Sequence, residues 1–209
     1  MQKIIARGGD SGENTPPRQT SNDGPSANPP VASFLMVCLG NICRSPLAEG
    51  ILQQKAHAAG LHWEVDSAGT NGFHIGEAPH PLSQKVARDN GLDISRQRAR
   101  KFKAADFYHF DKIYAMAGDV VDEMRRISGR EFNPAKVELL MNEVYPNSNR
   151  DVPDPWYGPE SGYHEVYDMI EKAADKIIAK YTTRSTPAGR TAANPQPEKT
   201  PNTQSEYEQ

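Results

Sequence analysis

The stretch SFLMVCLGNICRSPLAEGILQQKAHAAG, residues 33–60, holds both cysteines of the 209-residue chain and decides the expected fold. Its first six residues, 33–38, form an apolar run rich in strand-forming side chains. A tight loop follows, and residues 45–60 read as a helix with Ser45 as its N-cap and Pro46 as its first residue. A strand that leads through a short loop into a helix begins a strand–helix–strand unit.

The same alternation of strand and helix patterns continues along the chain. Strands that alternate with helices form a parallel sheet with both faces covered. We therefore predict an α/β fold, a three-layer doubly wound four-stranded parallel sheet whose ligand site lies beyond the carboxyl end of the first strand. The further predicted elements are strands at 61–69, 110–117 and 135–141, helices at 80–91 and 118–129, and a last amphipathic helix over 163–181.

The composition separates one domain from two polar ends. Hydrophobic residues make up 36% of the chain, and few of them lie in either end. We expect a disordered arm at 1–31, a domain at 32–182 and a disordered tail at 183–209. The net charge of −3 argues against a nucleic-acid partner. The sequence has no membrane-length apolar run and no signal-peptide core, which predicts a cytoplasmic protein.

The loop after the first strand has the features of a phosphate receptor. Gly40 and Asn41 tolerate positive φ, so the chain can curl and point successive backbone N–H groups inward. These amides would lie beside the positive end of a helix dipole. The guanidinium of Arg44 can bind two phosphate oxygens at once. The predicted phosphate-binding residues are Leu39, Gly40, Asn41, Ile42, Cys43 and Arg44.

Cys38 makes this receptor a candidate catalyst. The amides, the helix N-terminus and Arg44 all favour the thiolate form of the cysteine. A thiolate beneath a bound phosphate can attack the phosphorus in line with the leaving oxygen. We expect Ser45 to donate a hydrogen bond to the sulfur, Asn41 to brace the loop, and Glu49 to be a favourable acid in the first helical turn.

Other uses of the two cysteines fit the sequence less well. Buried cysteines commonly serve as small hydrophobic residues, which would leave Cys38 and Cys43 without chemistry. None of the six histidines lies at metal-ligand spacing, so no metal is predicted. A nucleotide-binding P-loop would need a Lys-Ser/Thr end that this loop lacks.

A thiolate that displaces a phenol from phosphorus needs an acid to protonate the leaving oxygen. Asp154, in DVPDPWYGPE at 151–160, is the candidate, because the prolines on both sides restrict its backbone. Trp156 and Tyr157 follow it and could wall a slot for a flat aromatic group. The alternative is a stiff connector in which Asp154 is an ordinary turn residue. We expect the competing carboxylate, Asp151, to be solvated.

Three motifs, CLGNICRSP at 38–46, DSAGT at 66–70 and DPWYG at 154–158, together resemble the low-molecular-weight protein tyrosine phosphatases. The resemblance runs from about residue 33 to 181, with the motifs in the same order. It implies a cofactor-free, two-step hydrolysis of phosphotyrosine in proteins or of small aryl phosphates.

The resemblance also implies a role for each matched residue. Cys38 would form a phosphocysteine, Arg44 would bind the phosphate and stabilise the transition state, and Asp154 would act first as acid and then as base for water. Cys43 would form a reversible disulfide with the nucleophile and protect it from overoxidation. Asn41, Ser45 and Ser67 match the family's supporting positions. The residues that match its substrate-selecting aromatic wall are Phe73, Trp156 and Tyr157.

Three positions depart from the family pattern. Gln97 stands where many members have a histidine bonded to the loop asparagine, and an amide can also bond there. Ala117 replaces an aspartate that is common after the methionine, which removes one supporting contact. His80 falls where an acid is frequent.

Three rival functions remain beside phosphotyrosine hydrolysis. Phosphoarginine phosphatases resemble CxGNTCRS, with threonine at the position of Ile42, so the isoleucine favours phosphotyrosine. Arsenate reductases relay oxidation through further cysteines, which this chain lacks. A phosphoprotein-binding module without catalysis would not need Cys38, Arg44 and Asp154 together. The physiological substrate and the oligomeric state stay open.

Overall fold

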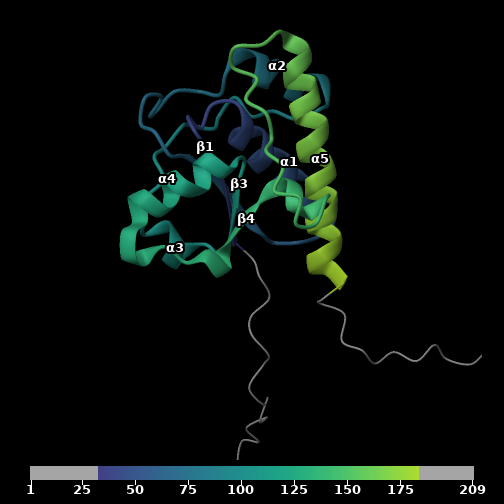
Figure 1. The fold of residues 1–209 in the computed structure, drawn as a ribbon. Coiled ribbons are helices and arrows are strands. Elements are labelled where there is room, and N and C mark those ends of the chain that lie inside the picture. The colour runs from purple at the N-terminus through teal and green to yellow at the C-terminus, as the bar shows by residue number, and fades with distance from the viewer. Residues whose placement is uncertain (1–32, 184–209) are drawn as a thin grey trace, which may run out of the picture.

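The fold is built on four parallel strands in the order β2-β1-β3-β4, as seen in a computed structural model that describes residues 33–183 (Figure 1). The sheet confirms the predicted parallel α/β architecture. The arm predicted at 1–31 and nearly all of the predicted tail lie outside the described residues. The strands are β1 (Ser33–Cys38), β2 (Glu64–Gly69), β3 (Lys112–Ala115) and β4 (Val137–Leu139).

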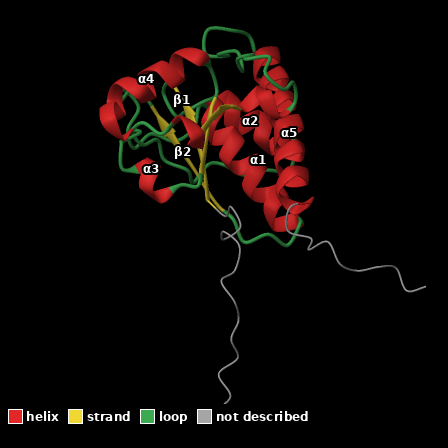
Figure 2. Cartoon of the chain, turned by 60° about the horizontal axis from the view of Figure 1, so that its bottom comes forward, coloured by secondary structure: helices red, strands yellow, loops and turns green. Residues whose placement is uncertain are grey.

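Helices cover both faces of this sheet, which confirms the three layers (Figures 1 and 2). One face carries α1 (Arg44–Ala58), α2 (Pro81–Asp89) and α5 (Glu160–Thr183), and the other carries α3 (Asp106–His109) and α4 (Gly118–Ser128). None of the helices within residues 33–183 is long and apolar enough to cross a membrane.

The side chains of β1 alternate between the two halves of the core. Phe34, Met36 and Cys38 belong to the apolar cluster under α1 and α5, whereas Leu35 and Val37 belong to the cluster under α3 and α4. Successive side chains of a strand point to opposite faces, so a strand that is covered on both sides is apolar throughout. This alternation places Cys38 at the carboxyl end of the central strand, beside α1.

Several element boundaries differ from the prediction. β3 and β4 are shorter than the apolar runs at 110–117 and 135–141. For β4 the reason is that 3-10 turns at 134–136 and 140–143 flank it. The one-turn helix α3 was not predicted. The expectation that Ser45 caps α1 was wrong: the helix begins at Arg44, and Cys43 is the N-cap without a side-chain cap bond. Glu49 therefore lies beyond the first turn.

The end of β2 packs directly against the loop that follows β1. A Cβ atom on Gly69 would lie 2.9 Å from backbone atoms of Leu39, Gly40 and Asn41. No real Cβ approaches backbone that closely, so only glycine leaves the loop in this position. The next residue continues the contact, because the Thr70 N–H donates to the Cys38 carbonyl at 3.0 Å. The DSAGT motif at 66–70 therefore packs directly against the loop at 39–43, which is called the phosphate loop below.

Candidate active site

The loop between β1 and α1 curls around the sulfur of Cys38. Asn41 has φ of 58°, the left-handed conformation that asparagine tolerates, whereas Gly40 does not take a positive φ. In this conformation the backbone N–H of Asn41 donates to Cys38 Sγ at 3.2 Å. The loop ends at Arg44, where α1 begins, so the free N–H groups of the first helical turn lie beside it.

A hydroxyl also faces the sulfur. Ser45 Oγ lies 3.0 Å from Cys38 Sγ, and both residues are buried. Asn41 Nδ2 donates to Ser45 Oγ at 2.9 Å, so the serine hydrogen can go to the sulfur or to the Ala68 carbonyl at 3.5 Å. The Cys38 sulfur therefore has two hydrogen-bonding groups beside it, the Asn41 N–H and the Ser45 hydroxyl. These roles of Ser45 and Asn41 were predicted from the residue types and their positions in the sequence.

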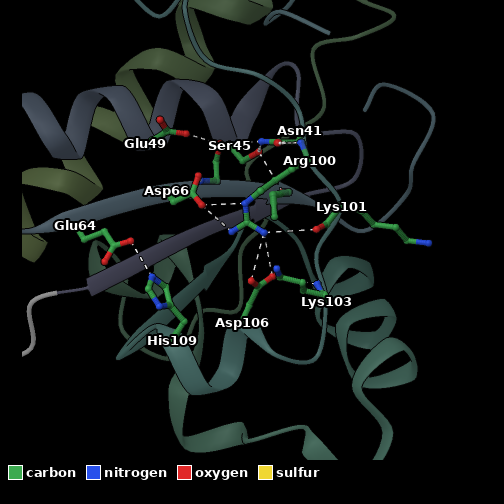
Figure 3. A network of polar contacts seen from close by, with 12 residues as sticks. Asn41, Ser45, Glu49, Glu64, Asp66, Arg100, Lys101, Lys103, Asp106 and His109 are labelled. Carbon is green, nitrogen blue, oxygen red and sulfur yellow. Dashed lines mark hydrogen bonds and ion pairs between the residues drawn. The ribbon is translucent and has the colours of Figure 1, made fainter. Parts of the chain in front are cut away.

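The asparagine continues this network away from the sulfur (Figure 3). Its Nδ2 also donates to Ser67 Oγ at 2.8 Å, and Ser67 Oγ donates to Glu49 Oε2 at 2.6 Å. Its Oδ1 accepts the backbone N–H of Arg100 at 2.8 Å. Sequence reasoning missed Glu49 and Arg100 as members of the site, because no local pattern links them to residues 38–45.

The expected contact between Gln97 and the loop asparagine is wrong. The two N–H bonds of Asn41 go to Ser45 and Ser67, and its oxygen is occupied by Arg100. The amide of Gln97 instead interacts with the Glu49 carboxyl, and its Oε1 is buried without a partner among the described residues.

Glu49 is a partly buried carboxyl group that interacts with Ser67 and Gln97. Burial raises the pKa of Glu49 from 4.5 to about 7, against the opposing effect of the hydrogen bond from Ser67. The network next to the catalytic loop therefore contains a group that changes charge near neutral pH.

Arg44 joins the phosphate loop to the segment that contains the candidate acid. Its Nη1 donates to the Val152 carbonyl at 3.1 Å, and its Nη2 lies 2.5 Å from Asp154 Oδ2. The guanidinium is buried, and its Nε has no partner among the described residues. A buried donor without a partner is costly, so this N–H is suited to an oxyanion bound in the loop.

The segment 151–160, which contains Asp154 and is called the acid loop below, is fixed at several points. Asp154 Oδ1 accepts the N–H of Trp156 at 3.2 Å, which orients the carboxyl group, while its side chain stays 38% exposed. Asp151 is exposed, as expected, but it is not simply solvated. Its Oδ1 accepts the N–H of Gly118 at 2.9 Å.

Cys38, Arg44 and Asp154 line one pocket of about 380 Å³ at the carboxyl end of β1. Phe73 and Tyr157 are 84% and 96% exposed at its mouth. The Trp156 ring lies between two histidines, with centroid distances of 5.4 Å to His74 and 5.2 Å to His80. His74, which the sequence did not single out, also lines the pocket. The predicted nucleophile, phosphate ligand, acid and aromatic wall therefore meet in one place.

Cys43 differs from Cys38 in its surroundings. Burial and the nearby Cys38 raise the pKa of the Cys43 thiol to about 12, although Tyr163 lies within a weak hydrogen-bond distance of 4.0 Å. Cys43 is therefore a thiol at neutral pH.

Among the described residues, Asp89, Glu160 and His164 form an exposed group that could approach a cation. Lys85 Nζ already lies 3.0 Å from Asp89 and 2.6 Å from Glu160. The ammonium of Lys85 pairs with both carboxylates, so the group does not resemble a metal site.

We predict that Glu49→Gln changes how stability depends on pH. Between pH 4.5 and 7 the folded protein keeps the proton on Glu49 and the unfolded chain releases it, so rising pH destabilises the wild type. Relative to Glu49→Gln, the wild type should lose up to about 3 kcal/mol of unfolding free energy across this window. Urea unfolding at several pH values measures the difference.

The exposed Glu165 offers a matched control, because Glu165→Gln removes a carboxyl that is not buried. A stability difference between wild type and Glu49→Gln that stays constant from pH 4.5 to 7 would contradict the assignment.

The chain is similar to proteins of known family along most of its length. The family model for the low molecular weight phosphotyrosine protein phosphatases matches residues 33–186. A low molecular weight protein-tyrosine-phosphatase of Streptomyces coelicolor is 37% identical over 147 residues, which are 68% of this chain and 89% of that protein.

Two solved structures extend this similarity to the fold. YfkJ from Bacillus subtilis superposes with a TM-score of 0.69 at 33% identity, over 77% of this chain and 100% of that one. A Drosophila arginine phosphatase superposes with a TM-score of 0.65 at 29% identity, over 71% and 96%. With its parallel sheet, its cysteine loop and its family match, this chain belongs to the low molecular weight phosphotyrosine protein phosphatase family.

Proposed function

We propose that this chain is a protein tyrosine phosphatase that hydrolyses phosphotyrosine and small aryl phosphates without a cofactor. One observation carries the proposal. The sulfur of Cys38 faces two hydrogen-bonding groups, on Asn41 and Ser45. At the end of the same loop, Arg44 contacts Asp154, which lies 110 residues further along the chain. The membership in the family and the resemblance of its motifs support the same reaction.

In the first step, the Cys38 thiolate attacks the phosphorus and the bond to the phenolic oxygen breaks. Arg44 and the loop amides bind the phosphoryl oxygens, whose charge is spread in the transition state. Asp154 in its acid form gives a proton to the leaving oxygen. A phosphate in the loop competes with Asp154 for the guanidinium of Arg44, which frees the carboxyl group for this transfer.

In the second step, water attacks the phosphocysteine. The Asp154 carboxylate takes a proton from this water, the sulfur–phosphorus bond breaks, and inorganic phosphate leaves. The Cys38 thiolate is regenerated, and its hydrogen bonds from Ser45 and Asn41 stabilise it as leaving group. Neither step oxidises or reduces a group, so the cycle needs no reactant besides the phosphate ester and water.

The aromatic residues favour a flat leaving group. Trp156, Phe73 and Tyr157 line the pocket around the cysteine loop, where they can contact the ring of phosphotyrosine. Ile42 offers no hydroxyl to orient water beside a guanidinium leaving group. We therefore favour phosphotyrosine over phosphoarginine, the second candidate that the likeness to the Drosophila arginine phosphatase raises.

We predict that Cys38→Ser abolishes turnover and that Asp154→Ala lowers kcat/KM for a phosphotyrosine peptide by about 10²–10⁴-fold, because the leaving oxygen is then not protonated. Release of inorganic phosphate from phosphotyrosine and phosphoarginine peptides of one sequence measures both effects.

The wild type should prefer the phosphotyrosine peptide. Turnover of p-nitrophenyl phosphate no faster than by Cys38→Ser would defeat the enzymatic proposal. Preference for the phosphoarginine peptide would leave the enzymatic proposal in place and change its substrate class from phosphotyrosine to phosphoarginine.

We also propose that Cys43 protects the nucleophile in a cytoplasmic setting, where reductants keep both cysteines as thiols. Peroxide oxidises the Cys38 thiolate to a sulfenic acid and is reduced to water. Cys43 then attacks the Cys38 sulfur, its proton leaves with the hydroxyl as water, and a disulfide forms. A thiol reductant reverses the disulfide.

We predict that wild-type protein treated with peroxide recovers its activity on addition of dithiothreitol, whereas Cys43→Ala does not, because its sulfenic acid is oxidised further. Peptide mapping without reductant detects the disulfide. Equal recovery by Cys43→Ala, or permanent loss in the wild type without a disulfide, would contradict the protective role.

A further inference from the structure

The helix α4 begins without a cap from its own sequence. Ala117 is the N-cap residue in an extended conformation, and its methyl group cannot accept a hydrogen bond. The first N–H groups of a helix lack partners inside the helix, and they carry the positive end of its dipole. Asp151 supplies the missing acceptor from 33 residues further along, since its Oδ1 accepts the Gly118 N–H at 2.9 Å.

Asp151 also lies at the start of the acid loop, two residues after Asn149, whose N–H and Oδ1 are both hydrogen-bonded to Asn142. Residues 145–150, which precede it, are all exposed. Val152, which follows it, is fully buried; its N–H donates to the Met116 carbonyl at 2.7 Å and its carbonyl accepts from Arg44. From this anchored pair, the chain reaches Asp154 after a single proline.

We propose that Asp151 is a positioning residue for Asp154. By binding the start of α4, its carboxylate fixes the beginning of the acid loop, and the stiff Val152–Pro153 link carries this position to the general acid. The inference rests on the proposed function, because Asp154 matters here as the acid of that reaction. Capping α4 stabilises the helix as well, so the experiment must separate capping from positioning.

The leaving group distinguishes the two roles. Phenol leaves as a much more basic oxyanion than p-nitrophenol, so its departure depends more strongly on a correctly placed acid. A displaced Asp154 therefore lowers kcat/KM for phenyl phosphate more than for p-nitrophenyl phosphate. A protein that is only less stable loses both activities in proportion.

We predict that Asp151→Ala lowers kcat/KM about tenfold for phenyl phosphate and about twofold for p-nitrophenyl phosphate. Asp151→Asn keeps an acceptor oxygen and should retain most of the wild-type ratio between the two substrates. In the Asp154→Ala background, Asp151→Ala should no longer change this ratio, because the two residues act through one step.

Ala117→Ser, made in the Asp151→Ala background, is the decisive control. The serine hydroxyl can cap α4 from its own N-cap position, and should recover thermal stability without recovering the substrate ratio. Amide hydrogen exchange gives a readout without turnover: the Val152 N–H should exchange about tenfold faster in Asp151→Ala, with or without the serine.

An unchanged ratio and unchanged Val152 exchange in Asp151→Ala would overturn the proposal. So would recovery of both by Ala117→Ser, which would reduce Asp151 to a helix cap. If the wild type hydrolyses neither substrate, the proposed function fails, and the exchange of Val152 alone decides whether Asp151 holds the loop.

Discussion

The side chain of Asn41 holds together three segments that the chain brings in from different places. It donates to Ser45 on α1 and to Ser67 on β2, and it accepts the backbone N–H of Arg100. Its backbone N–H meanwhile points at the sulfur of Cys38. Asn41 makes all four contacts from the left-handed conformation, with φ of 58°, and together they hold the phosphate loop in its shape.

A second connection couples this loop to the acid. Arg44 is buried, and it binds both the backbone and the carboxylate of the loop at 152–154. The residue that binds phosphate thereby also locates the residue that protonates the leaving group. Because both loops lie at the carboxyl end of the sheet, the doubly wound topology brings them together over a separation of 110 residues.

Much of this arrangement is predictable from local patterns. The strand, loop and helix at 33–58 follow from an apolar run, a flexible loop and a proline-containing helix start, and the alternation of elements determines the parallel sheet. The strand ends were predicted less well, since the short β4 is followed by a 3-10 turn that continues the same apolar run. Hydrophobic pattern alone does not separate these conformations.

The parts that depend on distant contacts were not predictable. Ser45 resembles an N-cap, but its hydroxyl faces Cys38, because the helix already begins at Arg44. Glu49 resembles an acid in the first helical turn, yet it is partly buried and accepts a hydrogen bond from Ser67 on β2. The missing cap at Ala117 is supplied from another segment by Asp151. Each of these roles becomes visible only when the partner's position is known.

Trapping of the covalent intermediate tests the central claim most directly. The protein is mixed with p-nitrophenyl phosphate, quenched in acid within milliseconds, and digested for mass spectrometry. The account predicts one phosphoryl group on the peptide that contains residues 33–44, located on Cys38. Turnover without a phosphorylated Cys38, or with the phosphoryl group on another side chain, would contradict it.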